Sequence, residues 1–166
     1  MPSLSRMSAT VLALAAGAAL FPAIPSHAQA EQGPPAGCTG PASGTWITVV
    51  ASGLRNSKGT LTITLYPDDS RRFLVKHGSM YATRVQAVQG VTRGCIFVPK
   101  PGIYAIALYH DENANHKIDR SGIGLPTEGY GFANNPSTLA GLPAFSSVRL
   151  NIPRPGLVTR IQMKYP

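Results

Sequence analysis

The sequence has few of the residues from which common enzyme and metal sites are built. Its 166 residues include two cysteines and four histidines. The histidines are not spaced from the cysteines as a structural zinc site requires. Neither the Gly-x-Ser-x-Gly turn of serine hydrolases nor the His-Glu-x-x-His helix of zinc proteases is present. These absences count against the commonest hydrolase classes.

Acidic residues are also scarce, with seven against fifteen lysines and arginines. The basic residues are scattered, apart from one cluster at Arg71, Arg72 and Lys76, and no aromatic residues interleave with them. Specific nucleic-acid binding is therefore not expected. The excess positive charge indicates an ordinary solvated surface.

Long apolar runs are absent after the first thirty residues. Arg6 precedes an uncharged apolar segment, Ala9 to Phe21, and a small-x-small pattern ends at Ala30. This order is typical of a cleavable secretory signal peptide, with an uncleaved membrane anchor as the alternative. We therefore expect a signal peptide at residues 1–30, a flexible lead at 31–44 and one periplasmic or secreted domain at 45–166. The mature chain is expected to have no transmembrane segment.

The two cysteines, Cys38 and Cys95, favour a disulfide, because exported chains with an even cysteine number usually pair them. Closing the chain between them would stabilise the fold by about 4 kcal/mol on the loop-entropy argument. Two alternatives remain open. The cysteines could be buried free thiols, or Cys38 could carry a lipid anchor, although Pro35 and the distance from the apolar segment count against acylation.

From Thr45 onward, apolar residues recur at every second position, which is the period of a β-strand. The clearest strand is Thr60 to Tyr66, and the near-continuous apolar segment Ile103 to Tyr109 predicts a strand covered on both faces. The turn residues Asn56 to Gly59 predict a hairpin between Trp46–Ala51 and Thr60–Tyr66. Further strands are predicted at residues 85–91, 95–98, 148–152 and 157–165, and a short helix at 70–77.

About seven short strands separated by Gly/Pro turns predict an all-β protein, an antiparallel β-sandwich with one long functional loop. The loop is His110 to Asn135. Its oxygen-bearing side chains follow the spacing of a calcium-binding loop, and Lys117 would add its backbone carbonyl. The predicted metal-binding residues are Asp111, Asn113, Asn115, Lys117 and Asp119.

Two positions depart from the usual calcium loop. His116 stands where the loop normally has glycine, and Gly122 stands where it has a bidentate glutamate. We therefore expect calcium binding to be weak, with Glu128 available as a third carboxylate. The alternative is a turn in which the same side chains cap the loop's own backbone amides.

The motifs Gly102–Ala105, His110–Asn113 and Gly124–Asn134 resemble the exported bacterial family known as domain of unknown function 2141. The resemblance extends over about residues 45–165. It implies the same export and sandwich fold but no particular reaction, and the family usually has glycine where Ala114 and His116 stand. The turn and strand at Pro101–Tyr104 also resemble those of transthyretin-like domains, which implies a prealbumin- or immunoglobulin-like arrangement.

Three functions remain in view. We expect a non-catalytic module that binds an envelope polysaccharide or protein, with calcium ordering its loop. A carbohydrate- or peptide-binding accessory domain would use Tyr130 and Phe132 as its ligand-binding rings. A small hydrolase would use His110, Asp111 and Glu128, but adjacent residues of a strand point to opposite faces, which counts against a simple His110–Asp111 pair.

Overall fold

The computed structural model describes residues 33–138 and 142–166, which form two β-sheets. The predicted signal peptide lies outside the described residues. The first sheet contains β1 (Cys38–Thr39), β5 (Gly90–Val98), β2 (Thr45–Leu54) and β9 (Leu157–Gln162), in that order. In the second sheet β4 (Tyr81–Gln86) lies beside β3 (Thr60–Pro67), and β3 beside β6 (Gly102–Asp111).

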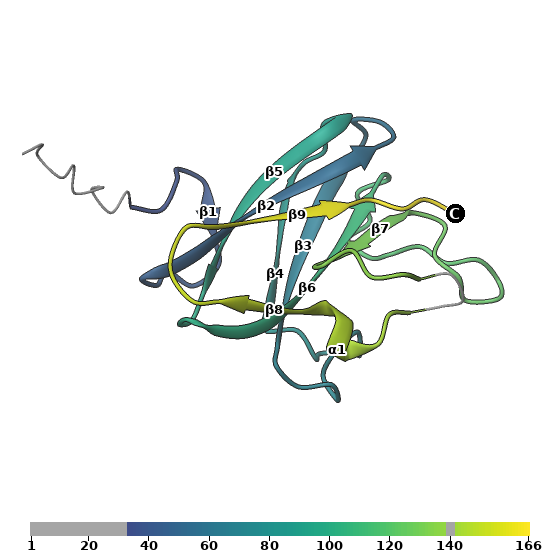
Figure 1. Cartoon of the computed structure of the whole chain (residues 1–166). Coiled ribbons are helices and arrows are strands. Elements are labelled where there is room, and N and C mark those ends of the chain that lie inside the picture. The colour runs from purple at the N-terminus through teal and green to yellow at the C-terminus, as the bar shows by residue number, and fades with distance from the viewer. Residues whose placement is uncertain (1–32, 139–141) are drawn as a thin grey trace, which may run out of the picture. The chain divides into compact units, whose positions relative to one another are not determined.

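The far side of β6 pairs with two short strands placed one after the other along it. β8 (Arg149–Ile152) pairs with the beginning of β6, and β7 (Gly129–Phe132) pairs with its end. Apart from the parallel pairs β1–β5 and β2–β9, the neighbouring strands are antiparallel. The layered arrangement in Figure 1 confirms the predicted all-β sandwich.

The core lies between the two sheets and follows the alternation in the sequence. Every second residue of β2, β3 and β6 is buried on the inner face, where each fully buried aliphatic side chain contributes about 1.5–3 kcal/mol. The largest of these buried aliphatic side chains are Ile47, Leu61, Ile63, Leu65, Ile106 and Leu108.

The hairpin predicted between Trp46–Ala51 and Thr60–Tyr66 is wrong. β2 pairs with β5 and β9, whereas β3 pairs with β4 and β6, so the Asn56–Gly59 turn carries the chain from one sheet to the other. Both strands keep the predicted apolar faces, which meet across the core. The turn signal indicates a tight reversal, but it does not determine whether the second strand stays in the same sheet.

The predicted short helix at residues 70–77 is also absent, and turns occupy this segment. Leu74 and His77 both have positive φ, at 57° and 59°, which a right-handed helix cannot accommodate. A one-turn helix occurs instead at α1 (Phe145–Val148). Among the described residues, no helix has the length and apolar character needed to cross a bilayer.

β6 is covered on both faces, as its sequence predicts. Ile106 and Leu108 face the core, while Ala105 and Ala107 lie under a second apolar cluster on the outer face of the sheet. This cluster is aromatic: Phe73 makes edge-on contacts with Tyr66 and Phe132, at 5.3 and 6.1 Å between ring centres. The outer face of this sheet therefore has apolar packing of its own.

The predicted disulfide between Cys38 and Cys95 is present. The two residues are direct partners in the parallel β1–β5 pair, with Cα atoms 4.4 Å apart. Thr39 adds a side-chain hydrogen bond of 2.6 Å to Thr83 of the other sheet. The disulfide thus fixes the N-terminal lead to an edge of the sandwich.

Reduction of this disulfide is expected to lower the free energy of unfolding by about 2–4 kcal/mol, because the unfolded chain regains the freedom that the cross-link removes. Urea unfolding with and without reductant measures the difference. In a Cys38→Ser/Cys95→Ser variant, reductant should have no effect. Equal stability of the wild type under both conditions would show that the bond does not constrain the folded domain.

Candidate functional site

The polar residues at the end of β6 are divided between the two faces of its sheet. His110 points into the sandwich and Asp111 points outward, and both side chains are fully buried. Asp111 is the last residue of β6, and the chain then forms the loop 112–128 before it returns at β7. The candidate site therefore has an inner polar network and an outer loop.

The His110 imidazole has a partner at each nitrogen. Nε2 lies 2.8 Å from the Lys58 carbonyl oxygen, and Nδ1 lies 2.7 Å from the Tyr165 hydroxyl. Because a carbonyl only accepts, Nε2 carries the proton in the neutral ring and Nδ1 accepts from Tyr165. The ring thus links β6 to the turn after β2 and to the C-terminal segment.

An ion pair closes this network at the surface. Arg55 donates two hydrogen bonds to Glu112, of 2.6 and 2.7 Å, and its guanidinium carbon lies 4.7 Å from the centre of the Tyr165 ring. The hydrogen bonds from Arg55 hold the pKa of Glu112 below its ordinary value, and burial raises the pKa of the Tyr165 hydroxyl. These contacts fasten the first residue of the loop to the body of the domain.

Asp111 organises the first half of the loop. Its Oδ1 accepts the backbone N–H of Asn115 at 3.0 Å, and its Oδ2 accepts that of His116 at 2.8 Å. Ala114 and His116 both have positive φ, at 57° and 65°. His116 is the sixth position of the predicted calcium loop, where such loops have glycine for a sharp turn. Asp111 therefore stabilises a positive-φ backbone, which glycine adopts more readily, at two residues that carry a Cβ.

Asn113, Asn115 and Asp119 converge on one point of the loop. The Nδ2 groups of both asparagines donate to the Asp119 carboxylate over 2.7–3.0 Å. These hydrogen bonds, from Asn115 above all, lower the pKa of Asp119. The Oδ1 atoms of Asn113 and Asn115 accept the backbone N–H groups of Asn115 and Lys117. The structure thus brings together three of the five predicted metal-binding residues.

The donor set fits a hard cation in kind, since it consists of carboxylate and amide oxygens. It also fits in backbone shape, because the sharp turn at His116 is formed. The oxygens, however, already accept N–H groups of the loop itself. Among the described residues, no group of three or more His, Cys, Asp or Glu side chains is placed to hold a metal ion. A cation would therefore have to turn the two asparagine amides.

Glu128, predicted as an available third carboxylate, bonds to two backbone amides of the loop. Its side chain is buried, with Oε1 accepting the Glu112 N–H and Oε2 accepting the Asp119 N–H, both at 3.0 Å. The carboxylate therefore clamps the beginning of the loop to its middle. The three residues of the hydrolase alternative have separate partners: His110 faces Tyr165 and Lys58, whereas Asp111 and Glu128 each accept two loop amides.

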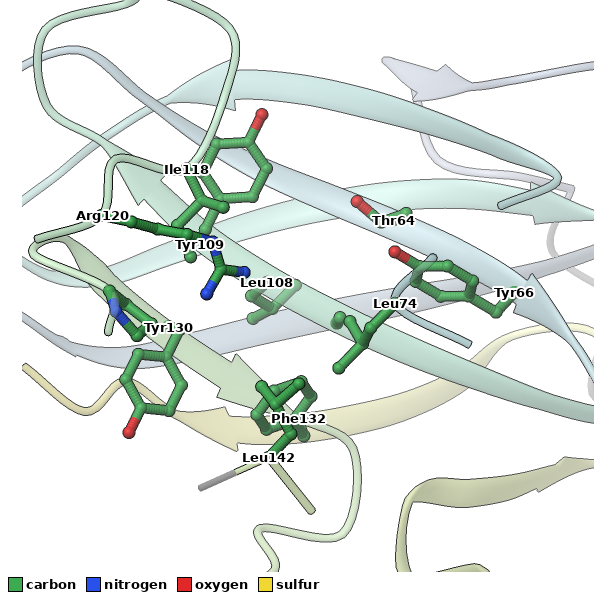
Figure 2. Close-up of a pocket in the computed structure, with 12 residues that line it drawn as sticks. Thr64, Tyr66, Leu74, Leu108, Tyr109, Ile118, Arg120, Tyr130, Phe132 and Leu142 are labelled. Carbon is green, nitrogen blue, oxygen red and sulfur yellow. The ribbon is translucent and has the colours of Figure 1, made fainter. Parts of the chain in front are cut away.

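Next to the loop, a pocket of about 150 Å³ opens on the outer face of the β3–β6–β7 sheet. Tyr130 and Phe132, the two predicted ligand-binding rings, lie in its wall with their centres 5.9 Å apart. Figure 2 shows Arg120 and Tyr109 among the side chains that line the pocket. The other labelled lining residues are Thr64, Tyr66, Leu74, Leu108, Ile118 and Leu142.

Four residues that line the pocket were not predicted from the sequence: Arg120, Tyr109, Thr64 and Tyr66. Three of them come from the outward positions of β3 and β6, which alternate with the core residues. That alternation was visible in the sequence. Which outward positions face a pocket depends on where the loop 112–128 lies over the sheet, and the strand pattern contains no information about that.

Comparison with known proteins gives one match. A family model described as "Uncharacterized protein conserved in bacteria (DUF2141)" matches residues 49–159. No curated protein and no solved structure shows a significant match. The matched region contains the loop 112–128 and the pocket residues Tyr130 and Phe132, but not Cys38 or Tyr165.

The positive φ values in the loop lead to a stability prediction. Ala114→Gly is expected to raise the free energy of unfolding by about 0.5–1 kcal/mol, because glycine adopts φ > 0 without the Cβ penalty. His116→Gly should act in the same direction. Ala82→Gly is the matched control, since Ala82 is exposed on β4 and does not have a positive φ, so glycine there should lower stability. Chemical unfolding measures all three, and a fall in stability for Ala114→Gly would contradict the prediction.

Proposed function

The chain belongs to the family of uncharacterised proteins conserved in bacteria, DUF2141, and we propose that it acts outside the cytoplasm as a non-catalytic binding module for an envelope polysaccharide. The observation that carries this proposal is the pocket in which Tyr130 and Phe132 lie with Tyr109 and Arg120. Aromatic rings offer flat faces to sugar rings, and a guanidinium and hydroxyls offer hydrogen bonds at their edges.

The size of the pocket indicates what it holds. Its volume of about 150 Å³ is below the roughly 300–1,000 Å³ of sites that enclose a whole small molecule. It has room for one ring or one side chain of a longer ligand. A polymer lying across the sheet with one sugar ring in the pocket satisfies this limit.

The partners of His110 favour binding over hydrolysis. A general base has to reach a substrate proton, directly or through one water. His110 is fully buried, and both of its nitrogens have partners within the protein. The imidazole thus serves as a cross-link between three segments of the chain.

Within this proposal, calcium would act on the loop and take no part in a reaction. Asp111, Asn113, Asn115, Asp119 and the Lys117 carbonyl would hold it. The bound calcium would replace the internal N–H donors around Asp119. Ile118 and Arg120 are the sequence neighbours of Asp119 and both line the pocket, so the cation would stiffen the pocket wall.

Calcium at about ten times its Kd is expected to stabilise the domain by about 1.4 kcal/mol and to raise Tm by a few degrees. Magnesium should do less, since it dehydrates reluctantly. Asp119→Ala should abolish the response while leaving the bonds from Asp111 to the loop amides in place. Asp111→Ala should abolish the response too, and it should also destabilise the protein in chelator, because its bonds to the Asn115 and His116 amides are lost. If the wild type melts at one temperature in both, the loop caps itself and the cation proposal fails.

Binding is tested by saturation-transfer NMR with a tetrasaccharide of N-acetylglucosamine and with a uronic-acid oligomer. Tyr130→Ala and Arg120→Ala are expected to weaken binding by about tenfold, which corresponds to the loss of one stacking or charged contact. Val158→Ala, on β9 of the other sheet, is the control and should bind like the wild type. Absence of a saturation signal for both oligosaccharides would overturn the polysaccharide proposal.

A further inference from the structure

The pocket on the outer face of the β3–β6–β7 sheet has walls on three sides. The loop 112–128 lines it at one end of the strands, Tyr66 and Leu74 line it at the other end, and the rings of β7 form the third side. None of the lining residues comes from β4, the edge strand beside β3. A ligand longer than the pocket can therefore leave it across β3 towards β4.

The side chains along this route are small. Thr64 and Ala107, which line the pocket, are register partners on β3 and β6, and Thr64 is in turn the partner of Ala82 on β4. Directly opposed residues of neighbouring strands lie on the same face of a sheet, so these three residues form one row. Ala82 is exposed, and about 9–10 Å separates it from Ala107, since two strand spacings lie between them.

The neighbouring row on the same face carries larger polar side chains. Arg84 of β4 pairs with Thr62 of β3, Thr62 pairs with Tyr109 of β6, and Tyr109 pairs with Tyr130 of β7. The two tyrosines line the pocket. Arg84 therefore lies at the far end of a row that begins with the pocket rings.

Two polar groups of this row have no partner in the part of the chain that the structure describes. Arg84 is exposed, and its guanidinium makes no hydrogen bond or ion pair there. Thr62 is 1% exposed, and its hydroxyl also lacks a hydrogen-bond partner. A buried unsatisfied hydroxyl costs free energy that a valine of the same shape would avoid. The row thus has hydrogen-bonding capacity that the fold leaves unused.

We propose that a polysaccharide lies across the strands, with one sugar ring in the pocket and the following rings over β3 and β4, where Arg84 donates hydrogen bonds to it. This inference rests on the proposed function and adds the direction of the chain and a second contact. The pocket, of about 150 Å³, leaves the rest of a polymer outside, and its open side faces β4. A guanidinium carries five N–H donors, which suit the oxygens of a sugar. A ligand needs about two further rings to reach β4 from the pocket, because two strand spacings separate them. A disaccharide therefore does not reach Arg84.

The test compares two ligand lengths by NMR titration of the ¹⁵N-labelled protein. The probes are the disaccharide and the tetrasaccharide of N-acetylglucosamine, and uronic-acid oligomers of the same two lengths. We expect the tetrasaccharide of the sugar that binds to have about tenfold higher affinity than its disaccharide, and to shift the amide signals of residues 82–86, which the disaccharide leaves in place. Arg84→Ala should lower the affinity for the tetrasaccharide by about tenfold, through the loss of a charged hydrogen bond, and leave that for the disaccharide unchanged.

The matched control is Arg93→Ala, because Arg93 is an exposed arginine of β5 in the other sheet. This variant should bind both lengths as the wild type does, and thermal melting confirms that each variant is folded. Equal affinity of the wild type for the two lengths overturns the inference and leaves binding at the pocket intact. Unchanged tetrasaccharide binding in Arg84→Ala, or an equal loss in Arg84→Ala and Arg93→Ala, overturns it in the same way. Absence of binding at either length overturns the proposed function, and this inference with it.

Discussion

Two buried carboxylates, Asp111 and Glu128, hold the end of the molecule that carries its candidate functions. A loop as long as 112–128 has no apolar core of its own, so its shape has to come from hydrogen bonds. Asp111 accepts the amides of Asn115 and His116, and Glu128 accepts those of Glu112 and Asp119. Burying a carboxylate costs free energy unless its oxygens are satisfied, and here each oxygen meets a backbone donor.

The pocket depends on this arrangement. Ile118 and Arg120 flank Asp119, whose amide Glu128 binds, and both line the pocket. Asp111 also stabilises the unfavourable backbone of Ala114 and His116, which a chain with glycine at those positions would adopt more readily. The hydrogen bonds to Asp111 thus fix the loop and offset the free-energy cost of positive φ at Ala114 and His116.

Much of the fold could be predicted from the sequence, because alternation of apolar residues determines which face of each strand is buried. Thr60–Tyr66 and Ile103–Tyr109 lie within β3 and β6 as expected. The sheet to which each strand belongs could not be predicted, and the hairpin between β2 and β3 was wrong for that reason. The helix expected at residues 70–77 failed because Leu74 and His77 adopt positive φ, which composition does not reveal.

The candidate site was predictable where a role follows from local spacing. The grouping of Asn113, Asn115 and Asp119 and the opposite directions of His110 and Asp111 both follow from their positions along the chain. The role of Glu128 does not, because its partners are backbone amides brought close only by the return of the chain. Arg120 likewise acquires its place in the wall of the pocket from the path of the loop (Figure 2).

The distribution of polar and apolar groups at this end of the sandwich is the reverse of that in a typical hydrolytic site. The residues with catalytic chemistry, His110, Asp111 and Glu128, are buried and bonded to the protein. The accessible side chains include Tyr130 at the pocket, Ile123 and Leu125 of the loop, Arg120 between them, and the loop residues Asn113, Asn115 and His116. Such a surface offers contact area and charge to a ligand, and it holds its proton-transfer groups away from one. The polar motif therefore builds the loop, and the loop in turn contributes Ile118, Arg120 and Pro126 to the wall of the pocket.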